Sequence, residues 1–355
     1  MLHLGFLLFF ATVLANPIPQ SIPHIHNLED SVFKLPVGKG TKVYFLSNGD
    51  DNSLKQIAVK ADKSNINTNV FSYAIPQADG SLNPLMITAD DDTLVVTRPD
   101  GITAQVSLYR NNITQNLNVF PVFEKSSIKF KSGVNVFFNV DKPANRILTL
   151  KNLNLAVNSD RVIASSGVPG DAHPYTFFDT NAYPAEQFYS KLNIPLVNFH
   201  LSQIDKGVTY EVSFDAASKF LDDSGLIMTN GFPLNVFYSD LQYPLNTNGQ
   251  QMSLRMAPYF YYTIGYNTVI TVRFKGGLYQ GNDFQSVATG KLTASGEITS
   301  VEISSPGPYA IQYIATRNGT APTGPTDTPV ITTTKSSGVF QLTACLFIVL
   351  ISFWV

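Results

Sequence analysis

A run of aromatic residues is the most distinctive candidate for chemistry in this sequence of 355 residues. Tyr259, Phe260, Tyr261 and Tyr262 are consecutive, and Tyr266 follows closely; we call these five residues the aromatic strip. Neighbouring residues of a β-strand point to opposite faces, so these rings cannot all enter one core. Rings left on the surface would stack on sugar rings or contact a protein partner, whereas a strand covered on both faces would bury them all. The aromatic strip is therefore the candidate ligand-binding site.

Short acidic runs offer a second kind of chemistry, metal binding. Aspartates are adjacent at residues 50–51, 90–92 and 222–223. Calcium binds six to eight oxygens that converge from several loops, and no run here has the spacing of an EF-hand loop. Because aspartate is also common in solvated turns, we interpret the runs as turns between strands. No metal site and no cofactor is predicted.

The histidines offer a third kind, acid–base catalysis. His24 and His26 have a spacing that suits a metal ion, while His173 and His200 are isolated in the sequence. The chain contains no Gly-x-Ser-x-Gly elbow, no His-Glu-x-x-His motif and no glycine-rich phosphate loop. Two carboxylates would serve a glycan hydrolase, but nothing in the sequence pairs any two of them. No catalytic residue is predicted, and a cleft that brought a histidine to carboxylates would favour a hydrolase.

The elements that must position these residues are β-strands. Apolar and polar residues alternate in residues 104–108, 208–214, 252–256 and 270–274, as in strands with one buried face. Turn-forming Gly, Pro, Asn and Asp residues separate these segments. Only PAEQFYSKL, residues 184–192, suggests a short helix. Strands at this spacing, without intervening helices, predict an all-β chain of antiparallel β-sandwiches.

The chain is long enough for two domains. A break at SSGVPGDAHP, residues 165–174, predicts two tandem antiparallel β-sandwich domains of the jelly-roll-like kind, at residues 27–163 and 176–316. Residues 317–338 are dense in Thr, Pro, Gly and Ser and hold almost no bulky side chains. Such a segment cannot bury enough apolar surface to offset the entropy of ordering, so it is predicted to be a disordered stalk.

The N-terminus has the pattern of a secretory signal. Residues 4–14 are apolar and uncharged, and Ala15 precedes Asn16-Pro17. The apolar run is too short to span a bilayer. We therefore expect residues 1–15 to be a signal peptide that is removed during secretion.

The C-terminus has the pattern of a membrane anchor. Residues 339–355 carry no charge, and no Lys or Arg follows them as a cytoplasmic flank. Ser336, Ser337 and Gly338 are small residues directly before this apolar tail and are the candidate attachment sites for a glycosylphosphatidylinositol (GPI) lipid. The missing flank favours the lipid over a single transmembrane helix, although the polar spacer typical of the lipid signal is short.

Charge and cysteine content exclude several classes of function. The chain has 24 basic and 26 acidic residues, and this balance argues against a nucleic-acid partner. Its one cysteine, Cys345, lies in the apolar tail, so the part outside the membrane has no disulfide to stabilise it. Asn112 and Asn318 begin Asn-x-Thr sequons and are predicted N-glycosylation sites.

Three segments resemble a known family. SGLIMTNGFP at residues 224–233 resembles the opening of a CUB domain, and GPYAIQYIA at 307–315 resembles its closing strand. LPVGKGTKVYFLSNGDD, from residue 35, is similar to a Pro-x-Gly strand motif, and the whole arrangement resembles the secreted CUB-like proteins of nematodes. The chain departs from that family in lacking disulfides and a matching set of calcium-binding acids. The resemblance implies a non-enzymatic module associated with innate immune responses to pathogens.

Together these patterns predict a secreted, lipid-anchored glycoprotein on the outer face of the plasma membrane, including its raft regions. Its partners would be the membrane and an extracellular protein or glycan. Two alternatives remain open, a cell-surface glycan hydrolase and a structural component of a surface coat.

Overall fold

The computed structural model describes most of the chain between residues 24 and 317. The described residues are 24–112, 116–123, 128, 132–140, 146–155, 161–170, 175–204, 208–216, 223–229, 232–233, 239–245, 250–260, 267–285 and 291–317. They belong to one compact unit. The predicted signal peptide, the attachment residues Ser336, Ser337 and Gly338, the apolar tail and the stalk beyond Arg317 lie outside them.

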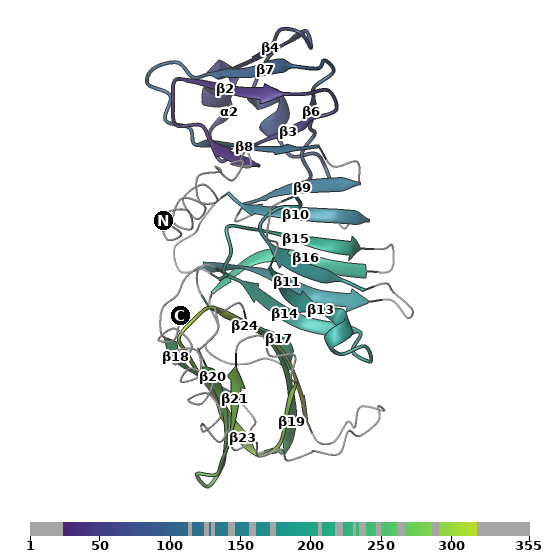
Figure 1. Ribbon diagram of the computed structural model, residues 1–355, viewed down its shortest axis with the longest axis vertical. Helices are drawn as coiled ribbons and strands as arrows, with labels where there is room; N and C mark the ends of the chain where they lie inside the picture. Colours follow the sequence, from purple (N-terminus) through teal and green to yellow (C-terminus); the bar gives the residue numbers. More distant parts are fainter. Residues whose placement is uncertain are drawn as a thin grey trace, which may run out of the picture. The chain divides into compact units, whose positions relative to one another are not determined.

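The protein is all-β, as the sequence predicts (Figure 1), and the strands of the described residues form five sheets. The first has the order β1 (Ile25–Asn27), β8 (Val106–Asn111), β3 (Lys42–Ser47) and β6 (Leu85–Met86). The second has the order β2 (Val32–Val37), β7 (Asp92–Thr97), β4 (Ala58–Ala61) and β5 (Ile66–Asn69). The third is five-stranded, with the order β13 (Thr176–Asp179), β12 (Ile163–Ser166), β15 (Asn198–Ile204), β10 (Gly133–Asn139) and β9 (Leu117–Val122).

The two remaining sheets hold most of the C-terminal strands. The seven-stranded sheet has the order β16 (Val208–Ala216), β11 (Arg146–Leu155), β14 (Phe188–Ile194), β17 (Ser224–Met228), β24 (Tyr309–Arg317), β19 (Met252–Phe260) and β22 (Leu292–Gly296). The last has the order β18 (Ser239–Pro244), β23 (Ile298–Ser305), β20 (Asn267–Phe274) and β21 (Tyr279–Gln285). The pairs β9–β10 and β14–β17 are parallel. All other described pairs are antiparallel.

Helical structure among the described residues is limited to α2 (Asp51–Gln56), α3 (Phe71–Ala74) and the 3-10 turn η1 (Thr180–Ala182). None of these helices is long and apolar enough to cross a membrane. The helix expected at residues 184–192 is wrong, because most of that segment lies in β14, which pairs with β11 and β17. Pairing with two neighbouring strands overrides the weak local preference for helix.

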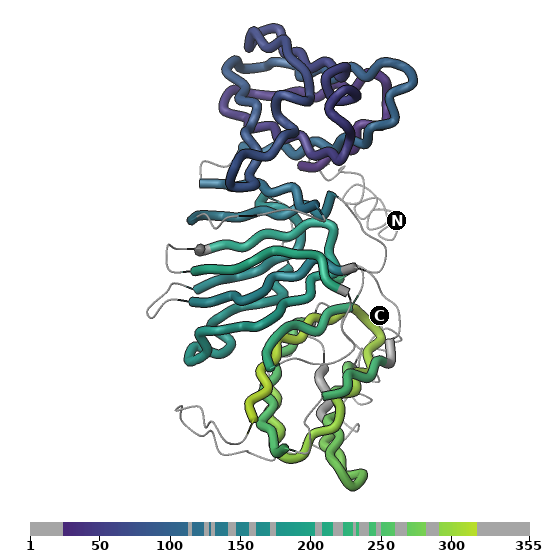
Figure 2. The backbone as a smooth tube through the Cα atoms, turned by 180° about the vertical axis from the view of Figure 1, so that it is seen from behind, coloured from purple at the N-terminus to yellow at the C-terminus, as the bar shows by residue number. Residues whose placement is uncertain are grey.

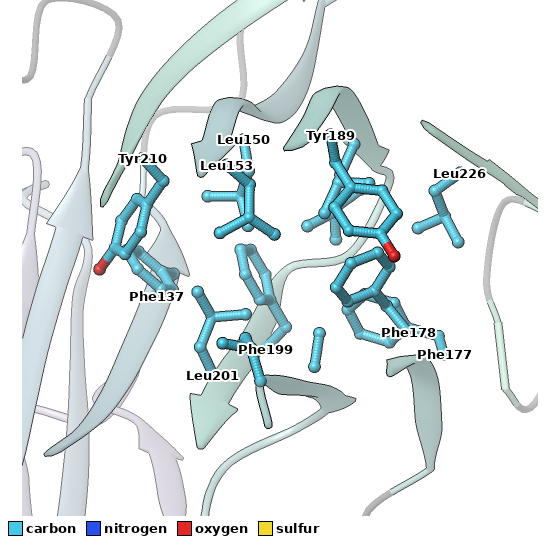
Figure 3. Packing of buried hydrophobic residues seen from close by; sticks show 14 of the residues in the cluster. Phe137, Leu150, Leu153, Phe177, Phe178, Tyr189, Phe199, Leu201, Tyr210 and Leu226 are labelled. Carbon is cyan, nitrogen blue, oxygen red and sulfur yellow. The ribbon is translucent and has the colours of Figure 1, made fainter. Parts of the chain in front are cut away.

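Four clusters of buried apolar residues pack between successive sheets. The N-terminal cluster joins the first two sheets, and a second cluster joins β3 and β8 to β9 and β10. The central cluster lies between the five- and seven-stranded sheets, and Figure 3 shows its rings and leucines interdigitating. The fourth cluster lies between the seven-stranded sheet and the last sheet. Three of the five sheets are therefore buried on both faces.

Strand β24 shows this double burial most clearly. Ala310 and Ile314 belong to the central cluster, whereas Tyr309, Ile311 and Tyr313 belong to the fourth. Because successive side chains of a strand point to opposite faces, a strand between two cores needs apolar residues at nearly every position. The continuous apolar run at the end of the described chain is thus explained by its place between two cores.

The sheets run across the expected boundary at residues 165–174. β10 pairs with β15, β11 with β14 and β12 with β13, so strands from both sides of that boundary share sheets (Figures 1 and 2). Two histidines, one directly before β1 and one in β15, donate hydrogen bonds to carbonyls of the β12–β13 loop. His24 Nε2 donates to the Gly170 carbonyl at 2.9 Å, and His200 Nδ1 donates to the Gly167 carbonyl at 3.1 Å. This loop joins sheets and does not separate them.

The four segments with alternating sequence are confirmed as strands. Residues 208–214 lie in β16, 252–256 in β19 and 270–274 in β20. Of residues 104–108, residues 106–108 begin β8, and Gln105 and the buried Ala104 precede the strand. Alternation predicted these strands because polar residues occupy one face of each.

Candidate functional site

The structure turns the first residue of the aromatic strip towards the core. Tyr259 lies near the end of β19, is half-buried and packs against the central cluster. Its hydroxyl donates a hydrogen bond of 3.1 Å to Gln312 Oε1. Phe260 is the last residue of β19, while Tyr261, Tyr262 and Tyr266 lie outside the described residues. Tyr259 thus serves the core, and the strip as a stacking surface stays a prediction.

Gln312 is the centre of a buried polar network. It is fully buried in the middle of β24, on the face that packs against the central cluster. Its Nε2 donates to the Tyr189 hydroxyl at 3.1 Å, and its Oε1 also accepts the Asp179 backbone N–H at 3.2 Å. Burial raises the pKa of Tyr189, so this phenol stays neutral. One amide thereby joins β13, β14, β19 and β24.

Beside this network lies a group that we call the Tyr183 cluster, formed by Tyr183, Glu186, Arg255 and Lys291. The Tyr183 ring is buried, with 6% of its surface exposed. The Arg255 guanidinium carbon lies 5.1 Å from the ring centroid, and the Lys291 Nζ lies 5.3 Å from it. Both distances fit cation–π attraction. Arg255 also donates to Glu186 Oε2 at 3.3 Å.

Backbone turns position the cluster between two parts of the chain. The 3-10 turn η1 is capped by Asp179, and the Tyr183 N–H and Glu186 N–H donate to the carbonyls of Thr180 and Tyr183. These bonds fix the turns between the end of β13 and the start of β14, which contain Tyr183 and Glu186. Arg255 comes from β19, whose register places it opposite Thr293 of β22. The cluster therefore forms only when the C-terminal strands pair.

Burial shapes the electrostatics of the cluster. Burial raises the pKa of Glu186, and the positive charge of Arg255 only partly opposes this effect. Burial also raises the pKa of Tyr183, whose hydroxyl has no hydrogen-bond partner within the described part of the chain. Lys291 is exposed, and no carboxylate of the described residues lies within 4.0 Å of it. The cluster thus carries more positive than negative charge.

The surface next to the cluster is polar. β22 is the edge strand of its sheet, and its Thr293 and Ser295 are exposed. Arg161 pairs with Asp179, with 2.9 Å between Arg161 Nε and Asp179 Oδ1. The hydroxyls of a sheet edge and the exposed Lys291 beside it suit hydrogen bonding to a polar, negatively charged ligand better than covalent chemistry.

The acidic runs have structural partners. Asp50 caps α2 by accepting the N–H groups of Asn52 and Ser53. Asp92 is buried and accepts the N–H groups of Ser64 at 2.7 Å and Thr93 at 2.8 Å. Among the described residues, no group of three or more His, Cys, Asp and Glu side chains is placed to hold a metal ion.

The remaining predicted residues are the histidines and the two sequon asparagines, and the structure describes some of them. His26 packs against the Phe33 ring at 5.4 Å, and His173 lies outside the described residues. Asn112 is exposed directly after β8, where a glycan has room, and Asn318 lies outside the described residues. His24 and His200 bind backbone carbonyls of the β12–β13 loop, as described above.

Sequence reasoning missed the residues of the Tyr183 cluster and Gln312. Gln312 left a signal, since it is the one side-chain amide within the apolar run of β24. Arg255 sits on the polar side of an alternating strand, where a charge is unremarkable. Nothing in the sequence brings it to Tyr183.

Comparisons with known proteins do not assign this chain to a family. No protein-family profile matches it, and a search of characterised proteins found no significant match. The resemblance to CUB-like proteins therefore stays a prediction.

Proposed function

We propose that this protein is a membrane-anchored extracellular binding protein and that its Tyr183 cluster contacts an acidic glycan. The observation that carries the proposal is the pair of cations held over the Tyr183 ring, 5.1 and 5.3 Å from its centroid. Arg255 is already paired with Glu186, which leaves Lys291 as the cation available to a ligand.

The neighbouring side chains favour a sugar as the carrier of the negative charge. Thr293 and Ser295 present hydroxyls on the exposed edge strand, and these can donate to and accept from sugar hydroxyls. Lys291 would bind the carboxylate or sulfate of such a sugar, and the positive charge of Arg255 would add to the attraction. The half-buried Glu186 fixes the Arg255 guanidinium, so the cation is oriented before the ligand arrives.

The wider context rests on the sequence. The predicted signal peptide, sequons, stalk and C-terminal anchor support a glycoprotein on the outer face of the plasma membrane. The resemblance to CUB-like proteins supports a role in innate defence, in which surface glycans of microbes would be ligands. We also propose sandwich-like packing of the sheets as the scaffold and residues 318–338 as its stalk, because Arg317, where the sequence predicted the stalk to begin, is the last residue of β24.

Binding to an array of glycans tests the site. Lys291→Gln should weaken binding to sulfated or carboxylated glycans by about tenfold, as expected for one lost charge-assisted hydrogen bond. Lys60→Gln is the matched control, because Lys60 is also exposed but lies on β4. Equal binding by both variants, or binding to neutral glycans only, contradicts the proposed site. If the protein instead binds a partner protein that carries no glycan, its ligand belongs to a different class.

Release by phosphatidylinositol-specific phospholipase C tests the anchor. We expect the enzyme to free the protein from cells, because the apolar residues 339–355 and the small residues directly before them resemble a GPI signal. Retention on the membrane, together with detection of an intact peptide from residues 339–355, would establish a transmembrane helix.

A glycan hydrolase is the second candidate, and the raised pKa of Glu186 favours it. A half-buried carboxyl group of this kind is suited to act as a general acid. Glu186 and Asp179 both act electrostatically on Tyr189. However, each is already paired with an arginine, which favours binding. Release of reducing sugars that Glu186→Gln abolishes would assign the hydrolase.

A further inference from the structure

One hairpin exposes two large apolar side chains that are adjacent in the sequence. Leu278 and Tyr279 lie where β20 turns into β21 and are 72% and 70% exposed. Among the described residues, the other exposed large apolar residues reach 51% at most and are not adjacent in sequence. Single exposed apolar residues are ordinary, whereas a protruding adjacent pair requires a reason. We call residues 275–279 the hairpin tip.

Backbone geometry makes the hairpin tip a projection. Gly276 and Gly277 both have φ near +83°, a conformation that favours glycine. A Cβ at either position would meet no atom within 4 Å, so the turn is open in the directions in which these two Cβ atoms would point. The hairpin is closed by the bond from Phe274 N–H to the Leu278 carbonyl at 2.9 Å. The two apolar side chains are therefore held out in a defined place.

The hairpin tip lies at the end of the sheets where the described chain finishes. Arg317 and Gly296 flank Met252 on its two sides, as partners on β24 and β22. Adjacent strands are about 4.8 Å apart, so Arg317 lies on the order of 10 Å from Gly296. The next residue, Glu297, accepts the Lys275 backbone N–H at 2.9 Å. β20 and β24 both run towards this end.

The sequence beyond Arg317 ends in the uncharged apolar residues 339–355. We propose that Leu278 and Tyr279 insert into the interface of the same lipid bilayer that holds this C-terminal tail or its lipid replacement. This inference rests on the membrane anchor of the proposed function. The anchor keeps the hairpin tip near the bilayer, so a small apolar pair suffices for contact.

The charges around the hairpin tip suit a lipid surface. Lys275 pairs with Glu297 at 2.8 Å, and Arg273 pairs with Glu302. Arg317 is exposed at the same end, where a basic side chain can meet lipid headgroups. Tyrosine favours the boundary between water and lipid, where its ring is apolar and its hydroxyl is wet.

Fluorescence quenching by lipids tests the contact. The chain has one tryptophan, Trp354 in the apolar tail, so Trp354→Phe gives a background without tryptophan. Tyr279→Trp in this background reports on the hairpin tip. Met86→Trp is the control, because Met86 is 45% exposed but lies in the first sheet. The full chain is placed in vesicles of phosphatidylcholine with brominated acyl chains.

We expect the tryptophan at position 279 to shift to shorter wavelength and to be quenched at least about two-fold more than that at position 86. Leu278→Ser added to Tyr279→Trp should reduce the quenching. Equal quenching at both positions, in protein that floats with the vesicles, overturns the inference while leaving the anchor intact. Failure to float overturns the anchor itself. A wavelength shift that depends on protein concentration and not on lipid would assign the hairpin tip to self-association.

Discussion

Replacing Gln312 with leucine is the sharpest test of the buried network. The amide is fully buried and makes three hydrogen bonds, to Tyr189, Tyr259 and the Asp179 N–H. Each buried polar group left without a partner costs about 1–3 kcal/mol. Tyr259 is only half-buried and has further contacts, so it contributes least to this cost. Leucine has nearly the same volume and is cheaper to bury, so it offsets part of this cost. We therefore expect the unfolding free energy to fall by about 2–4 kcal/mol.

Urea unfolding followed by circular dichroism measures this change. Gln242→Leu is the matched control, because Gln242 is an exposed strand residue with one hydrogen bond, from its Nε2 to Ser300 Oγ at 3.1 Å. The control should change the free energy by less than about 0.5 kcal/mol. If Gln312→Leu proves too unstable to purify, Tyr259→Phe removes one bond and should cost about 1 kcal/mol. A loss from Gln312→Leu no larger than that of the control would refute the network.

Three further predictions concern the fold and its modification. Gly225→Ala should cost about 1–3 kcal/mol in unfolding free energy, because its Cβ would lie 2.4 Å from the Lys191 carbonyl oxygen across the β14–β17 pair; a cost below 0.5 kcal/mol would show that the two strands can separate freely. Burial alone would raise the pKa of Asp92, but hydrogen bonds from Ser64 and neighbouring N–H groups lower this pKa overall. The ionised Asp92 should therefore stabilise the fold fully above about pH 4, and this stabilisation should be lost as the pH falls through the pKa of Asp92 in the folded protein. Asp92→Asn should therefore be less stable than the parent chain at neutral pH and lose less stability between pH 5 and about pH 2 in acid-unfolding curves; parallel curves would contradict this. Peptide-N-glycosidase should reduce the mass of the secreted protein, and Asn112→Gln should remove part of that shift, whereas an unchanged mass in protein from its own cells would contradict the secretory route.

The strands that the sequence predicted are those with a polar face. β16 alternates from Val208 to Phe214, and the structure confirms it as a strand. β9 and β24 alternate little, since nearly every residue in them is buried. A short apolar run of this kind has the same pattern in a buried strand and in a buried helix segment, so only its neighbours decide its structure. The same reasoning explains β14. Its local sequence suggested a helix, but pairing with β11 and β17 makes it an extended strand.

The candidate site shows the same division. Tyr259 stood out because it begins a run of aromatic residues, but its direction depends on β24 lying beside β19 and on Gln312 facing the same core. Tyr183 and Arg255 are distant in sequence and meet only because β13 packs near β19 and β24. Such a meeting depends on long-range pairing, which periodicity does not encode.

The sequence by itself predicts the chemical character of segments whose composition is distinctive. The uncharged apolar residues 339–355 predict an anchor, and the Thr- and Pro-rich segment before them predicts a stalk, because both predictions follow from transfer and ordering free energies of local composition. Alternation likewise identified strands such as β16 and β20, in which exposed or partly exposed residues alternate with buried ones. Only the tertiary structure decided that strands on both sides of residues 165–174 share sheets and that three sheets lie between two cores. The physical reason is that burial on both faces removes the alternation from the sequence, so the partners of each face are set by packing alone.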